Sequence, residues 1–157
     1  CDIQESMLVR AKEKLMTKGI LYSTHLVSKD AQGLLPFDNE VFDMIVSFYT
    51  FEHLYPFLFH LKEMIRVLKK GGLMVGAIPC EGGVAWGLGR FLTTRKWFKK
   101  NTSIDPDKII CWEHPNFADS ILHFLDTHLD KENLFFWPLR VPVIDGNLVV
   151  QFIYSRR

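Results

Sequence analysis

The stretch Phe42–Pro79, FDMIVSFYTFEHLYPFLFHLKEMIRVLKKGGLMVGAIP, decides the fold of this chain. It opens with Phe42–Phe48, a compact apolar run containing β-branched residues, which predicts a buried strand of the kind that parallel sheets use. Phe57–Lys70 follows with apolar residues at helical spacing, and the glycines at 71 and 72 favour a helix end there. Leu73–Ile78 is a second apolar run. A strand, helix and strand joined this closely predict a parallel βαβ unit with a right-handed crossover.

The flanking segments continue the alternation of helices and strands. Glu5–Lys18 and Phe117–Leu129 have helical spacing, and Leu21–Ser28 predicts a short strand. Two further strands are expected at residues 134–139 and 148–154, with Asp145-Gly146 between them as a turn signal of the hairpin kind. The whole chain therefore predicts an α/β sheet, mostly parallel with an antiparallel C-terminal strand and with helices on both faces.

Composition and charge exclude several classes of protein. The 157 residues fit one domain over 1–157, and 48% apolar with 24% charged residues exclude a disordered or disulfide-built chain. A net charge of +1 argues against a generally basic nucleic-acid binder. The three cysteines, Cys1, Cys80 and Cys111, are far apart and predict free thiols in a reducing compartment, so we expect a cytoplasmic protein.

Four motifs stand in order between Asp30 and Pro79. They are Asp30-Ala31 followed by LPF, the Phe42-Asp43 strand, the EHL segment at 52–54, and RVLKKGG at 66–72. Together they resemble class I S-adenosylmethionine-dependent methyltransferases of the type 11 branch, which usually have Pro where this chain has Lys70. The resemblance implies a Rossmann-like sheet and transfer of a methyl group from S-adenosylmethionine to a small-molecule acceptor.

The resemblance also implies where the cofactor binds. By the same alignment Asp2 accepts hydrogen bonds from both ribose hydroxyls, because a carboxylate can accept two bonds from a diol, and Ile3 packs on the adenine. Asp30 accepts from the adenine amino group while the Ala31 N–H donates to a ring nitrogen. Family members place further cofactor contacts at the end of the following strand, which here means Ser47 and Phe48.

The family's first strand and glycine-rich loop have no counterpart in this chain. Gly82–Gly89 is not a GxGxxG loop, because Leu92 stands where a third glycine is needed. We therefore expect that the chain is truncated at its N-terminus, that it is not a competent enzyme alone, and that its exposed strand edges favour self-association.

Two histidines are candidate catalytic residues. His53 follows the first predicted strand of the βαβ unit, and an imidazole suits proton removal near neutral pH; a cap or packing role is the alternative. His114 lies beside a variable segment, so its substrate role rests on position alone. Alignment can supply much of the rate of a methyl transfer, with or without a base. No metal site is expected, and Cys80 after Pro79 is expected to be buried and neutral rather than a nucleophile.

Residues 80–113 form a variable insertion on the substrate side. Within it, Trp86–Lys100 is basic and aromatic and contains no acidic residue. This stretch fits a solvated helix face, a site for an anionic or lipid-linked substrate or an anionic membrane, or, with a weaker signal, RNA. A non-catalytic Rossmann-like binding or assembly module is the alternative to a methyltransferase, and a nucleotide-dependent oxidoreductase is disfavoured by the LPF and RVLKKGG motifs.

Overall fold

The computed structural model describes residues 4–19, 27 and 34–157. The chain divides into two compact units, 1–36 and 37–157. In the first unit, α1 (Glu5–Thr17) confirms the predicted N-terminal helix, and Gly19 follows it with a positive φ of 68°. The predicted strand Leu21–Ser28 lies outside the described residues except for Val27.

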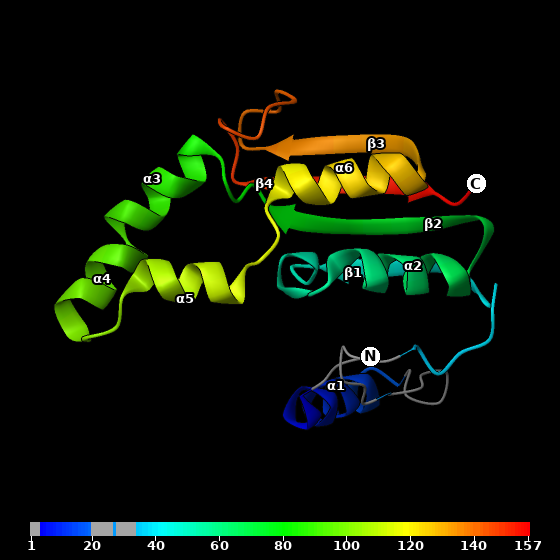
Figure 1. The fold of residues 1–157 in the computed structure, drawn as a ribbon. Helices are drawn as coiled ribbons and strands as arrows, with labels where there is room; N and C mark the ends of the chain where they lie inside the picture. Colours follow the sequence, from blue (N-terminus) through cyan, green and yellow to red (C-terminus); the bar gives the residue numbers. More distant parts are fainter. Residues whose placement is uncertain (1–3, 20–26, 28–33) are drawn as a thin grey trace. The chain divides into compact units, whose positions relative to one another are not determined.

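The second unit is built on a four-stranded sheet with the order β1-β2-β4-β3 (Figure 1). The strands are β1 (Phe42–Phe48), β2 (Leu68–Pro79), β3 (Asp130–Trp137) and β4 (Val149–Ser155). β1 and β2 are parallel, whereas β4 runs antiparallel to both of its neighbours. The α/β class and the antiparallel C-terminal strand are therefore confirmed, although only one pair of the described strands is parallel.

The helix of the βαβ unit ends earlier than its sequence predicts. α2 spans Phe57–Val67, and Leu68 already has extended backbone and begins β2. Leu68 pairs with Phe42 of β1, its side chain is fully buried, and Lys69 Nζ binds Asp43 Oδ1 at 2.7 Å. Strand pairing and burial thus override the helical propensity of residues 68–70, so the predicted end at Lys70 was wrong.

The core lies on one face of the sheet, under α2 and α6 (Ala118–His128) (Figure 1). Leu61 of α2 and Leu125 of α6 pack there against Met74 and Phe152. On the opposite face, the side chains that alternate with the core positions are exposed, namely Met44, Val46, Phe48, Phe135 and Trp137. Within residues 37–157, two predictions therefore fail. The strand β1 was predicted to be buried, but it is a half-exposed edge of the described sheet. Helices were predicted on both faces, but both sheet-covering helices of this unit lie on the same face.

Gly76 sits at the tightest point of the sheet. It pairs with Ser47 of β1 on one side and with Phe152 of β4 on the other. A Cβ atom on Gly76 would overlap the Ser47 carbonyl oxygen and lie 2.5 Å from Phe152 Cζ. Only glycine lets the two neighbouring strands approach in this register.

Three helices make up most of the segment 80–113. α3 (Val84–Leu92), α4 (Thr94–Asn101) and α5 (Pro106–Glu113) lie beyond the carboxyl end of β2 (Figure 1). Thr93 joins α3 directly to α4, and α5 leads back toward α6.

The connection between β3 and β4 is a long loop rather than a tight hairpin at Asp145-Gly146. The fully buried Asn147 organises it: its Oδ1 accepts from the Leu139 N–H at 2.9 Å, and its Nδ2 donates to the Val141 and Val143 carbonyls at 2.9 and 2.7 Å. Asp145 instead fixes the start of α3, because its carbonyl accepts from the Ala85 N–H at 2.8 Å. The antiparallel pairing of the two strands is confirmed, and the turn type was wrong.

Candidate functional site

A cluster of ionisable side chains lies where β1 and β2 end. Its members are Glu52 and His53 in η2 (Phe51–His53), Glu81 just after β2, Arg90 in α3, and His114 just after α5. In open α/β sheets, ligands bind beyond the carboxyl ends of the parallel strands. The cluster therefore occupies the position at which this class of fold carries its chemistry.

Glu81 is the centre of the cluster. The residue is only 4% exposed. Its Oε1 lies 2.6 Å from Arg90 Nη1, and its Oε2 contacts His114 Nδ1. A buried carboxylate is costly unless it is paired, so these two partners are what make Glu81 tolerable inside the protein. The Arg90 guanidinium also lies 5.6 Å from the centroid of the Trp86 ring, within the range of a cation–π contact.

The two predicted catalytic histidines meet in this cluster. Their ring centroids are 4.4 Å apart and the rings are perpendicular. His53 Nδ1 lies 2.8 Å from the Glu113 carbonyl oxygen, which can only accept, so Nδ1 carries the proton and Nε2 of the neutral ring is the free acceptor. His114 Nδ1 faces the Glu81 carboxylate, which accepts, and lies 3.5 Å from Arg90 Nη2, which donates; the closer contact with the carboxylate favours a proton on this Nδ1 as well. The His53 side chain is 47% exposed, so its Nε2 is open to a substrate.

Glu52 adds a second buried carboxyl group, whose role the sequence did not indicate. Its side chain is 3% exposed, its Oε1 lies 3.9 Å from His53 Nε2, and its Oε2 has no hydrogen-bond partner among the described residues. Burial raises the pKa of Glu52, and a hydrogen bond from its own backbone opposes that rise only in part. The EHL motif at 52–54 marked this glutamate without revealing that it is buried.

Asn116 holds the two halves of the cluster together. Its Nδ2 donates to the Phe51 and Leu54 carbonyl oxygens at 2.9 and 2.6 Å, and its N–H donates to the Glu52 carbonyl at 3.4 Å. The segment that carries His114 is thereby tied to η2, which carries His53. Spacing in the sequence does not reveal this role of Asn116, because its partners are remote in the chain.

The end of β1 provides the described part of the expected cofactor site. Ser47 is half-buried between β2 and the core, whereas Phe48 is exposed. Tyr49 follows with a φ of 52°, a left-handed conformation that is costly for a residue with a side chain and that clusters at functional sites. The predicted cofactor residues Asp2, Ile3, Asp30 and Ala31 lie outside the described residues.

Cys80 is a buried structural thiol rather than a nucleophile. It is fully buried, and burial raises its pKa to about 11, so little reactive thiolate forms at neutral pH. Within the part of the chain that the structure describes, no group of three or more acidic, histidine or cysteine side chains is placed to hold a metal ion. In the same residues, no helix is both long and apolar enough to cross a membrane.

The comparisons with known proteins agree with this fold. Residues 1–76 match the family model described as a methyltransferase domain. The demethylmenaquinone methyltransferase of Staphylococcus haemolyticus is 42% identical over 74 residues, which span 47% of this chain and 29% of that protein. The chain thus matches less than a third of the length of this curated relative. Residues 1–76 are therefore similar to the methyltransferase domain family, as the four motifs predicted.

Solved structures extend the likeness in fold to nearly the whole chain. The PH0226 protein of Pyrococcus horikoshii superposes with a TM-score of 0.69 at 17% identity, over 99% of this chain and 69% of that one. A SAM-dependent methyltransferase from Aquifex aeolicus gives a TM-score of 0.62 at 16% identity, over 99% and 66% of the two chains. The Rossmann-like methyltransferase fold is thereby confirmed.

Proposed function

We propose that the protein transfers a methyl group from S-adenosylmethionine to a small-molecule acceptor, with His53 and His114 as the catalytic residues. The observation that carries this proposal is the meeting of the two imidazoles at the carboxyl ends of β1 and β2, within a chain whose first 76 residues match a methyltransferase domain. S-adenosylmethionine supplies an electrophilic methyl group, so the protein's remaining tasks are to align the acceptor and take up its proton.

His53 is the proposed base. Its Nδ1–H is held by the Glu113 carbonyl, which leaves Nε2 to accept a proton from an acceptor hydroxyl, amine or carbon acid. The Glu52 carboxyl group lies on the buried side of the ring, with its Oε1 3.9 Å from Nε2. His114 follows α5, is held by Glu81, and is proposed to bind the acceptor through its own Nε2. The exposed ring of Phe48 fits the expected cofactor, because it offers apolar surface at the strand end beside these polar groups.

The acceptor is proposed to be an apolar small molecule that bears an anionic or lipid-linked part. The name of the Staphylococcus relative states that it methylates demethylmenaquinone, an apolar acceptor. In this chain, Trp86 and Arg90 place an aromatic surface and a cation beside the histidine pair. Self-association through the open strand edge and a cytoplasmic location remain predictions from the sequence.

The test is a methyl-transfer and binding assay on this chain and on the protein extended upstream of Cys1. Labelled S-adenosylmethionine is supplied with phenol, quinol and amine acceptors, and binding of S-adenosylhomocysteine is measured by calorimetry. We expect the extended protein to bind and to transfer, and His53→Gln to lower kcat by about 10²-fold or more with unchanged cofactor affinity. His123→Gln, an exposed histidine on α6, is the matched control.

Two results would overturn the proposal. If the extended protein binds neither S-adenosylmethionine nor S-adenosylhomocysteine, the chain is not part of a methyltransferase. If it binds them but His53→Gln and His114→Gln leave kcat unchanged, the histidine pair is not catalytic. Binding without transfer to any acceptor would favour the non-catalytic module.

A further inference from the structure

The helix α3 is amphipathic, but its apolar side faces solvent and its polar anchor faces the protein. Its polar anchor Arg90 and its Trp86 point toward the buried Glu81, as their contacts show. The apolar residues at i, i+4, i+7 and i+8 form the opposite stripe, and all four are exposed: Val84, Leu88, Phe91 and Leu92 are 70, 57, 60 and 60% exposed. A helix normally buries its apolar stripe, so this one lacks a partner of apolar character among the described residues.

The orientation of this apolar stripe is fixed by the fold. At its start, the Val84 and Ala85 N–H groups donate to the Asp145 side chain and carbonyl at 3.3 and 2.8 Å. Near its end, Arg90 is held by Glu81. Turning the stripe inward would break both anchors and leave the buried Glu81 without its arginine, so the stripe faces outward in the stable fold.

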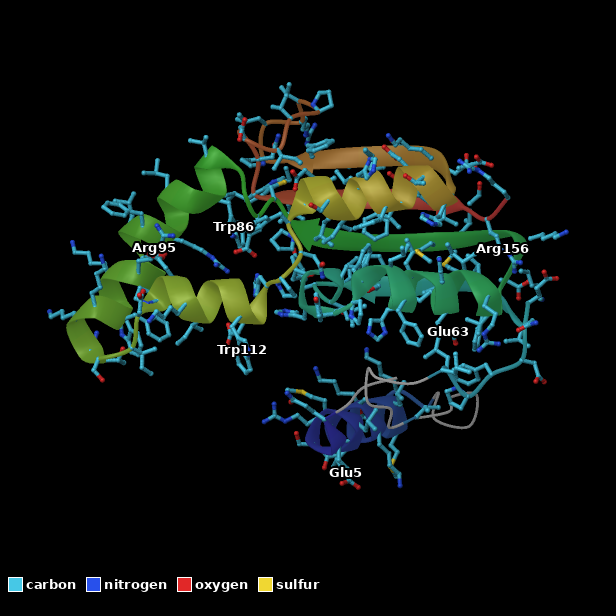
Figure 2. All side chains as sticks on the ribbon, in the orientation of Figure 1. Glu5, Glu63, Trp86, Arg95, Trp112 and Arg156 are labelled. Atoms are coloured by element: carbon cyan, nitrogen blue, oxygen red, sulfur yellow. The ribbon has the colours of Figure 1, made fainter. Side chains whose placement is uncertain are left out.

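A strongly basic helix adjoins the apolar stripe. α4 carries Lys96, Lys99 and Lys100, which are exposed and have no carboxylate partner among the described residues. Between residues 84 and 104 the sequence contains no aspartate or glutamate. Trp97 of α4 is also exposed, and Figure 2 shows Trp112 projecting away from α5, where it is 83% exposed.

We propose that α3 and α4 form a peripheral docking surface for an anionic lipid membrane. Apolar side chains beside lysines and tryptophans are the composition with which interfacial helices enter the headgroup region, the lysines meeting anionic lipid phosphates. The charge complementarity favours a membrane over a second copy of this chain, whose own basic α4 would be repelled. This proposal is independent of the proposed methyl transfer, although docking here would bring the neighbouring histidine pair close to lipid-borne acceptors.

The test is co-sedimentation of the chain with vesicles of phosphatidylcholine alone and with about one third phosphatidylglycerol. We expect binding to the anionic vesicles that falls with added salt. Each lysine near such a surface contributes a factor of about five, so K96E/K99E/K100E should lower the partition coefficient at least tenfold. Leu88→Ser with Phe91→Ser should lower it similarly, because the apolar stripe is lost.

Matched controls separate the surface from general charge and hydrophobicity. The charge control is K12E/K14E/K18E, at two lysines of α1 and the lysine that caps it, all three of which are also exposed. The apolar control is Phe135→Ser, an exposed phenylalanine of β3. Circular dichroism confirms that each variant is folded, and sedimentation velocity reports the oligomeric state.

Several outcomes would overturn the proposal. One is equal binding to neutral and anionic vesicles, or binding to neither. Another is a loss of binding as large in the controls as in the α3 and α4 variants. Binding of a short RNA in place of vesicles, abolished by the α4 lysine variant, would assign the surface to nucleic acid. A dimer that Leu88→Ser with Phe91→Ser dissociates would assign it to a second copy.

Discussion

The ion pair Glu81–Arg90 should show a much larger coupling energy than an exposed ion pair of similar length, because both side chains are largely buried. The Nη1–Oε1 distance is 2.6 Å, and the two side chains are only 17% (Arg90) and 5% (Glu81) exposed. Arg90→Met removes the cation but leaves the carboxylate buried, which costs about 3–5 kcal/mol in the free energy of unfolding. In the Glu81→Gln background Arg90→Met leaves no buried carboxylate unpaired, so it should cost much less. We therefore expect a coupling energy between the two substitutions of about 2 kcal/mol or more.

An exposed pair in the same insertion provides the control. Arg95 and Asp107 are separated by 2.7 Å, but their side chains are 36% and 56% exposed. The cycle of Arg95→Met and Asp107→Asn should therefore give a coupling of about 0.2–1 kcal/mol, because water screens the charges. The two distances differ by only 0.1 Å, so the difference in coupling energy reports mainly the difference in burial.

The assay is urea unfolding followed by circular dichroism and tryptophan fluorescence for the four proteins of each cycle. Agreement of the two probes establishes a two-state transition, which a coupling energy requires. A Glu81–Arg90 coupling below about 0.5 kcal/mol would lie within ordinary additivity and would refute the argument that burial makes this pair strong.

Three further predictions follow from single contacts. Gly76→Ala should lower the free energy of unfolding by about 3 kcal/mol or more, because the new Cβ meets the backbone of the neighbouring strand. Gly87→Ala in α3, where a Cβ meets nothing, should instead raise it by about 0.5–1 kcal/mol. Denaturant unfolding of both variants measures the two changes. Tyr154→Phe removes a hydroxyl that donates to Asp126 at 2.6 Å. Burial alone would raise the pKa of Asp126, but hydrogen bonds from Lys131 and Tyr154 lower it, so the stabilisation by its carboxylate is present above about pH 4 and is lost as pH falls. The free energy of unfolding that Tyr154→Phe costs should therefore shrink below that pH. An unchanged cost at about pH 3 would contradict this. Cys80, with its pKa raised to about 11, should react with iodoacetamide only after denaturant is added. Detection of the labelled Cys80 peptide by mass spectrometry after treatment of the native protein would contradict this.

The periodicity of the sequence predicted most elements because it reflects which side chains are buried. α1, α6 and the strand at 42–48 were found in this way, and the run at 73–78 lies inside β2. Boundaries failed where pairing decides them: Leu68 has helical neighbours in the sequence, but its backbone belongs to the sheet. Asp145-Gly146 predicted a tight turn between β3 and β4. The connection is a longer loop, because Asn147 binds the backbone of its other end and Asp145 anchors the start of α3.

The candidate site shows the same division. By itself, the sequence determined the α/β class, the methyltransferase motifs and the two histidines, because each depends on residue type and on spacing along the chain. Only the tertiary structure brought His53 next to His114, buried Glu81 with Arg90, and turned the apolar stripe of α3 outward. The histidine pair joins residues that are remote in the chain, and all three arrangements depend on burial and on the approach of groups in space, which no spacing in a sequence specifies.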